Sequence, residues 1–98
     1  MGFFYRIENI IWLRNIVDKI IRKHNVMPEE VEQIFDRHPQ FRFMEKGKTE
    51  GEDMSAAMGQ TNEGRYLIVC FIRKSPTEAL VITAREMERR ERGKYGKK

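Results

Sequence analysis

The fold class is decided by one stretch of the chain, Arg65-Tyr66-Leu67-Ile68-Val69-Cys70-Phe71-Ile72-Arg73. Its interior is rich in β-branched and aromatic residues, which favour strands. Apolar side chains occupy consecutive positions, so both faces of the strand need cover, as they do in the middle of a sheet. The apolar run is also far shorter than the ~20 residues of a membrane-spanning helix. We therefore expect a central β-strand here.

The flanking sequence predicts more of an antiparallel sheet. Asn62-Glu63-Gly64 is typical of a hairpin connection, and it follows a weaker strand predicted at 55–61. Ser75-Pro76-Thr77 predicts a turn into a further strand at 79–84. Phe41-Arg42-Phe43 alternates in polarity and is compatible with one more strand.

The first half of the chain predicts two helices. Apolar residues between Ile7 and Ile21 recur at three- and four-residue steps, although residues 3–12 also suit a strand. We expect a strand to about Trp12 and then a helix to His24, ended by Asn25, which tolerates the left-handed conformation. A second helix is expected from Pro28, and it should end before His38-Pro39 because the residue before a proline avoids the helical region.

A polar helix is expected at 85–95, where Glu86/Arg90 and Glu88/Arg92 stand four residues apart. The whole pattern predicts one α+β domain over residues 1–98. Two N-terminal helices and a C-terminal helix should pack on one face of a mainly antiparallel sheet of three to five strands.

Composition narrows the class of protein. The 98 residues are 40% hydrophobic and 35% charged, which is too apolar for a disordered chain and too charged for a membrane protein. The net charge of +4 lies entirely in residues 85–98, which carry 7 basic and 3 acidic side chains and end in a basic tail at about 93–98. Such an end favours a polyanionic partner, although a solvated, salt-bridged helix end would look the same. With one cysteine and no signal-peptide pattern, we expect a cytoplasmic protein without disulfides.

Three ordered patterns resemble a known family. Trp12 is followed by Lys23-His24-Asn25-Val26 and by Pro28-Glu29-Glu30-Val31-Glu32. Gly51-Glu52-Asp53, Met58-Gly59-Gln60-Thr61 and Gly64-Arg65-Tyr66-Leu67 come next, and then Val81-Ile82-Thr83-Ala84-Arg85-Glu86-Met87, Glu91-Arg92 and Tyr95. In this order and spacing, over roughly residues 10–95, the chain resembles the BrnT family of bacterial toxins.

The resemblance implies a RelE-like fold, metal-independent cleavage of RNA with no cofactor, and neutralisation by a small DNA-binding antitoxin encoded alongside. Toxin and antitoxin would form a hetero-oligomer, and a homodimer is the other assembly to consider. The chain departs from the family pattern at Leu13, where an acidic residue is usual, and at Lys48 and Met54. These departures keep a second function open, a module of the same fold that binds RNA or protein without cleaving.

Four residues are the candidates for catalysis, namely His24, Arg73, Arg85 and Tyr95. The unperturbed pKa of histidine, about 6.5, suits proton transfer. Arginine matches phosphate oxygens two at a time, and adjacent antiparallel strands are expected to bring Arg73 near Arg85 where the last helix begins. The Tyr95 phenol would donate a proton or stack on a base.

Each of these groups also has a structural alternative, such as a charge at a helix end, a surface salt bridge, or a ring that pins the last helix to the sheet. The expected helpers in binding RNA or phosphate are Lys23, Lys48, Arg89 and Arg92. The loop Glu50-Gly51-Glu52-Asp53 is a possible source of a general base. Two histidines, one cysteine and scattered acids give no metal-ligand spacing, so no metal site is expected.

Overall fold

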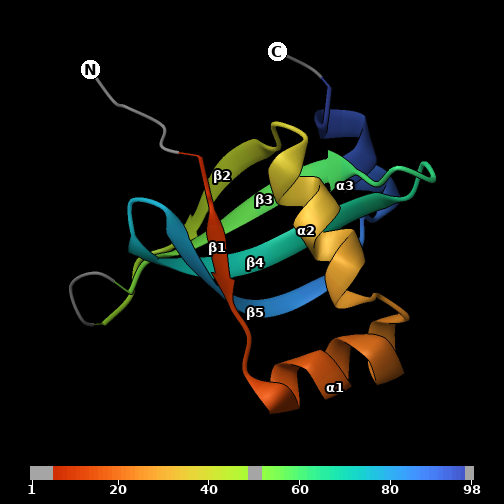
Figure 1. The fold of residues 1–98 in the computed structure, drawn as a ribbon. Helices are drawn as coiled ribbons and strands as arrows, with labels where there is room; N and C mark the ends of the chain where they lie inside the picture. Colours follow the sequence, from red (N-terminus) through yellow and green to blue (C-terminus); the bar gives the residue numbers. More distant parts are fainter. Residues whose placement is uncertain (1–5, 49–51, 97–98) are drawn as a thin grey trace.

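A computed structural model describes residues 6–48 and 52–96 as a five-stranded sheet with helices on both faces (Figure 1). The α+β class expected from the sequence is confirmed. In chain order, the elements are β1 (Asn9–Ile11), α1 (Arg14–His24), α2 (Pro28–Asp36), β2 (Gln40–Glu45), β3 (Met54–Gln60), β4 (Tyr66–Ser75), β5 (Glu78–Glu86) and α3 (Arg89–Lys94). No helix within the described ranges has the length and apolar character needed to cross a membrane.

The sheet has the order β1-β5-β4-β3-β2, so β4 lies in the middle, as its two apolar faces predicted. Strands β2 to β5 form an antiparallel meander, and β1 pairs with β5 in parallel. The hairpin between β3 and β4 turns at Gly64, whose φ of +95° is a conformation that glycine adopts without strain. Short connections of this kind make neighbouring strands antiparallel.

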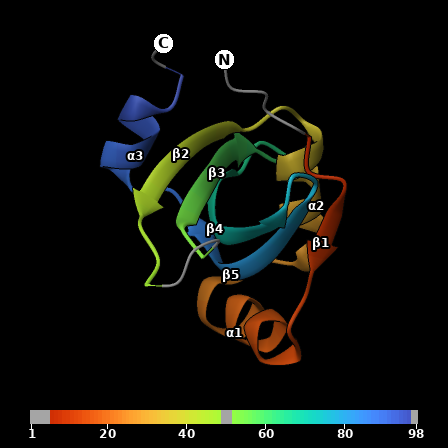
Figure 2. The same cartoon turned by 90° about the vertical axis from the view of Figure 1, so that its left-hand side faces the viewer.

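The main core lies between one sheet face and the first two helices. Phe71 of β4 is its centre, fully buried and in edge contact with the rings of Phe35 and Phe41 at centroid distances of 5.3 and 5.9 Å. Helix α2 crosses β3 and β4, while α1 lies along β5 (Figures 1 and 2). The apolar stripes predicted in residues 13–35 therefore face the sheet.

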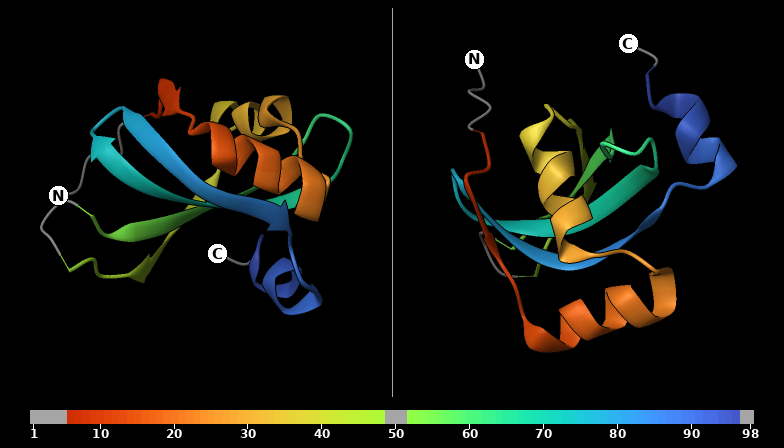
Figure 3. Two further views of the ribbon diagram at one scale, coloured as in Figure 1. Left: turned by 90° about the horizontal axis from the view of Figure 1, so that it is seen from below. Right: turned by 45° about the vertical axis from the view of Figure 1, so that its right-hand side comes forward.

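Helix α3 lies on the opposite sheet face from α1 and α2, as Figure 3 shows from below. The expectation of three helices on one face is wrong. Along β4, Leu67, Val69 and Phe71 point to the main core, whereas Tyr66 and Ile68 point the other way and pack with Met87 and Tyr95. Both faces of the central strand are apolar, so each needs its own cover.

The boundaries of α1 and α2 confirm the expected stop signals. Asn25 takes the left-handed conformation directly after α1, with φ 55°. Helix α2 ends at Asp36, and His38 before Pro39 also has φ 55°. The predicted strand before Trp12 is confirmed only as β1, and residues 3–5 of that prediction lie outside the described residues.

The prediction of a helix from residue 85 is wrong. Arg85 and Glu86 continue β5, where they pair with Ile68 and Leu67, and α3 starts only at Arg89. The ladder to β4 therefore overrides the helical charge spacing, and Glu86 binds Arg65 across the sheet end at 3.0 Å instead of meeting Arg90. Glu91 accepts a hydrogen bond of 2.8 Å from the backbone N–H of Glu88, and this contact caps the delayed helix start.

Candidate functional site

Helix α3 lies on the sheet face opposite α1 and α2, where Ala56, Met58 and Ile68 are buried, and we call this side of the sheet the open face because α3 covers only part of it (Figure 3). A hollow of about 350 Å³ lies here between β2, β3, β4 and α3. Three cationic side chains reach it from two elements: Arg42 of β2, and Arg90 and Lys94 of α3. Its other lining residues are Phe43, Met44, Ala56, Ile68, Glu88 and Glu91. Positive groups around a partly apolar floor suit a polyanion that also carries flat, apolar surfaces.

Arg85 is held at the margin of this hollow by Glu91. Its Nη1 and Nη2 atoms donate to the two carboxylate oxygens at 2.7 and 2.8 Å, which is a bidentate arrangement. This contact raises the pKa of Arg85, and the same contact lowers the pKa of Glu91, with help from the Glu88 N–H and from the charge of Arg42. Both outer nitrogens of the Arg85 guanidinium are thus engaged by the Glu91 carboxylate.

A second hollow, of about 630 Å³, lies on the other side of α3 and contains Tyr95. The Tyr95 ring contacts Tyr66 edge-on at 6.0 Å, and the Arg92 guanidinium lies 4.1 Å from the centre of the Tyr66 ring. Arg89, at the exposed first position of α3, lines the same hollow. The rings of Tyr66 and Tyr95 and the guanidinium groups of Arg89 and Arg92 therefore gather around this second hollow.

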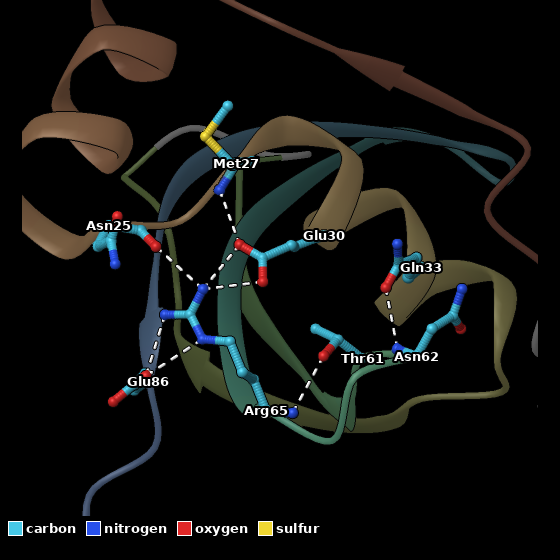
Figure 4. A network of polar contacts seen from close by, with 8 residues as sticks. All are labelled: Asn25, Met27, Glu30, Gln33, Thr61, Asn62, Arg65 and Glu86. Atoms are coloured by element: carbon cyan, nitrogen blue, oxygen red, sulfur yellow. Dashed lines mark hydrogen bonds and ion pairs between the residues drawn. The ribbon is translucent and has the colours of Figure 1, made fainter.

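His24 ends α1, and the structure ties this helix end to the end of β5. Arg65 Nη1 donates to the Asn25 carbonyl at 2.9 Å and to the Glu30 carboxylate at 2.7 Å, while its Nη2 donates to Glu86 at 3.0 Å (Figure 4). Asn25 and Glu86 are the chain neighbours of His24 and Arg85, so both candidates lie at the same end of the sheet. They lie on opposite faces, because α1 carries His24 on one face and Arg85 binds Glu91 of α3 on the other (Figure 3). His24 is half-buried, and Lys23 beside it is exposed.

The comparison with protein families matches residues 12–91 to the ribonuclease toxin BrnT of type II toxin–antitoxin systems. The chain belongs to the BrnT family. The match covers every described element except β1 and the end of α3. No curated protein matches the chain. The BrnT family is one of ribonuclease toxins that are paired with a protein antitoxin, and the open, cationic face is the candidate site for that activity in this member.

Arg73 lies elsewhere in this BrnT chain, so the expectation that it would meet Arg85 is wrong. Arg85 pairs with Ile68 on β4, and Arg73 comes five residues later, so the two side chains point to opposite faces roughly 17 Å apart along the strand. The Arg73 guanidinium lies 5.4 and 5.8 Å from the ring centres of Phe41 and Phe71, and it donates to the Pro76 carbonyl at 2.6 Å. Burial lowers its pKa.

Lys48 is also separated from the open-face site. It follows β2, whose last pair is Glu45 with Met54, and Met54 in turn pairs with Ile72 near the far end of β4. In the same loop Glu52 lies 3.7 Å from Lys74, and Asp53 accepts a hydrogen bond from the Gly47 N–H at 2.9 Å. Glu50 and Gly51, which belong to the predicted acidic loop, lie outside the described residues.

Four residues of the site were not singled out as functional from the sequence, namely Arg42, Arg90, Glu91 and Lys94. The alternation Phe41-Arg42-Phe43 contained a signal, because Arg42 must point away from Phe41, which packs in the main core. Glu91 appeared only as part of the family pattern, and its contact with Arg85 depends on where the strand ends and the helix begins. Over residues 6–48 and 52–96, no group of three or more His, Cys, Asp and Glu side chains could hold a metal ion.

Proposed function

We propose that this chain is the toxin of a type II pair and that it cleaves RNA without a metal ion on the sheet face next to α3. Arg85 would bind the scissile phosphate, and Arg42, Arg90 and Lys94 would bind neighbouring phosphates. The family assignment gives the class of activity, that of a ribonuclease, and we add to it a location, the sheet face next to α3.

The observation that carries the proposal is the bidentate contact between Arg85 and Glu91, at 2.7 and 2.8 Å. Arginine forks that accept two carboxylate oxygens accept two phosphate oxygens in the same way. A charged donor of fixed orientation stabilises the charge that develops on phosphorus-bound oxygens, and this stabilisation is often the largest single contribution to catalysis.

The chemistry needs no external nucleophile. The ribose 2′-oxygen attacks phosphorus while the bond from phosphorus to the 5′-oxygen breaks, giving a 2′,3′-cyclic phosphate and a 5′-hydroxyl. Glu91 is the candidate general base for the 2′-hydroxyl proton, once phosphate has replaced it on Arg85. Tyr95, which lies across α3 from Glu91, is the candidate acid for the leaving 5′-oxygen if the RNA strand passes over α3. His24 is on the sheet face that α1 covers, so it is assigned no step at this phosphate (Figure 3).

The experiment is to incubate purified protein with a labelled RNA in EDTA and to identify the new ends. We expect 2′,3′-cyclic phosphate and 5′-hydroxyl ends, with cleavage lost in Arg85→Ala and kept in the surface control Arg14→Ala. Intact RNA under all conditions, together with no growth defect on expression, would count against the proposal.

A non-cleaving member of the same family is the alternative that Leu13, Lys48 and Met54 motivate. Arg85→Ala separates the two functions. In an enzyme it should reduce turnover much more than affinity, whereas in a binding module it should reduce affinity alone. Binding without any cleavage by the unmodified chain would favour the alternative.

The proposal also includes the partner and the compartment. We propose a small DNA-binding antitoxin encoded beside this chain, a hetero-oligomer with it, and action in the cytoplasm, where RNA is available. Co-expression of the adjoining short reading frame should relieve growth arrest and yield a complex on size-exclusion chromatography.

A further inference from the structure

Strand β2 forms one margin of the sheet, beside α3 (Figure 2). Within the described ranges, no strand pairs with its outer side. A strand edge of this kind offers its backbone N–H and C=O groups to an extended peptide from another chain. The pairing register shifts between Phe43 and Glu45, so the regular part of the edge is Gln40–Phe43.

The side chains on this edge are unusually apolar for a surface. Phe43 is 63% exposed and Met44 is 45% exposed, and Phe43 is the most exposed of the large hydrophobic residues described. The Met44 sulfur lies 3.5 Å from Cys70 Sγ, so this side chain extends from the edge over the open sheet face. An exposed aromatic residue at an unpaired edge favours burial by a partner.

The hollow on the α3 side of this edge is lined by three cationic side chains and by two acidic ones, Glu88 and Glu91. Arg42 is exposed and points to the α3 side, where Arg90 and Lys94 share its hollow. Phe41 points to the other side, into the main core. Because side chains alternate across a strand, an added strand would place every second residue beside these cations and the residues between them beside Phe41 and Phe43.

We propose that β2 is the docking edge for the antitoxin, which adds an extended segment of alternating acidic and apolar residues to the sheet. This inference rests on the proposed function, since it takes the antitoxin as the partner. Its acidic side chains would meet Arg42, Arg90 and Lys94, and its apolar side chains would cover Phe43. The added strand would lie beside the open face, so docking and access of RNA to Arg85 would compete.

The test uses the polypeptide encoded beside this chain as the probe. Its affinity for the unmodified chain is compared with that for Phe43→Ser/Met44→Ser and for Ile11→Ser, a control on the opposite edge strand, where Ile11 is 37% exposed. We expect at least tenfold weaker binding for the double variant and a change of less than twofold for the control. Amide hydrogen exchange at 40–45 should slow in the complex of the unmodified chain. Circular dichroism confirms that each variant is folded.

Equal affinity of all three chains, or slowed exchange only at other residues, would overturn the docking edge. The docking edge is also overturned if Phe43→Ser/Met44→Ser weakens the binding of RNA but not of the polypeptide. It is overturned as well if the only effect of this double variant is to dissociate a homodimer. Failure of the polypeptide to bind the unmodified chain also overturns the inference. RNA cleavage by that chain alone then decides separately whether the proposed function survives.

Discussion

At the scale of single residues, the Arg85 guanidinium group directs its two outer nitrogens at one carboxylate, that of Glu91. Arg85→Lys keeps the positive charge but removes the fork. If two oxygens of the phosphate must be held together, we expect the rate of RNA cleavage to fall by about 10²-fold, the loss typical of one preorganised donor. Single-turnover kinetics at saturating enzyme measure this. The matched control is Arg14→Lys, and full activity of Arg85→Lys would show that charge alone suffices.

The same ion pair makes stability depend on pH. Arg85 lowers the pKa of Glu91, so the pair stabilises the folded chain above the ordinary pKa of a glutamate, and this contribution is lost as pH falls through the lowered value. Thermal unfolding of the wild type and Glu91→Gln from pH 7 to pH 3 tests this. We expect the wild type to melt at a higher temperature at pH 7 and the two curves to converge in acid. A difference in melting temperature that is constant over this range would contradict the assignment.

At the scale of elements, Arg65 joins the end of α1, helix α2 and the end of β5 (Figure 4). The Arg65 and Glu30 side chains are only 24% and 14% exposed, so removal of one leaves the other charge poorly solvated. We expect Arg65→Met to lower the free energy of unfolding by about 2 kcal/mol. This corresponds to a melting temperature lower by roughly 10 °C for a domain of this size.

A matched control for Arg65 is Arg6, whose contact with Asp36 is 3.6 Å long between side chains that are 61% and 68% exposed. Exposed pairs contribute little, so Arg6→Ala should change stability by less than about 0.5 kcal/mol. Equal effects of Arg6→Ala and Arg65→Met would contradict the view that Arg65 joins three elements.

Helix α3 is short, and aromatic contacts hold it against the sheet. Tyr95→Phe keeps the ring contact with Tyr66 but removes the phenol, so it separates the two roles considered for this residue. We expect an unchanged melting temperature and at least a tenfold loss of cleavage, since general acids contribute roughly 10²- to 10⁴-fold. Tyr95→Ala should lose both properties. A fully active Tyr95→Phe would leave Tyr95 with only the packing role.

At the scale of the whole molecule, Arg42, Arg90 and Lys94 line the hollow beside α3, and Arg85 lies at its margin. If Arg42, Arg85, Arg90 and Lys94 bind four phosphates, the logarithm of RNA affinity should fall with the logarithm of salt concentration with a slope of roughly −3. Filter binding of Glu91→Gln, which keeps all four cations, should give the same slope, whereas Lys94→Ala should reduce it by nearly one. A slope near zero would exclude binding through phosphates on this face.

The ends of the three helices show which features of the fold could be predicted from the sequence. Asn25 and His38-Pro39 set the ends of the first two helices correctly, because each signal acts through its own backbone angles. The spacing of Glu86 and Arg90 predicted a helix that the ladder between β4 and β5 prevents. A local charge pair contributes only a few tenths of a kcal/mol, so a long-range strand pairing overrides it.

The candidate site was only partly predictable for the same reason. Arg85, Tyr95 and the basic helix could be singled out from the sequence, but the sequence also predicted Arg73 beside Arg85. Both arginines lie near the carboxyl ends of adjacent strands, and in an antiparallel pair these ends lie at opposite ends of the sheet, so the expected contact could not form. Glu91 became visible only when the end of β5 and the start of α3 were known.

The sequence by itself therefore determined the class of fold, the central strand, the ends of the first two helices and the family, because these depend on local backbone preference and on ordered motifs along the chain. The tertiary structure decided that α3 covers the second sheet face, that Arg85 meets Glu91, and that β2 is left at an edge. These relations depend on strand register and on burial of both faces of β4, which exist only once distant segments have packed together.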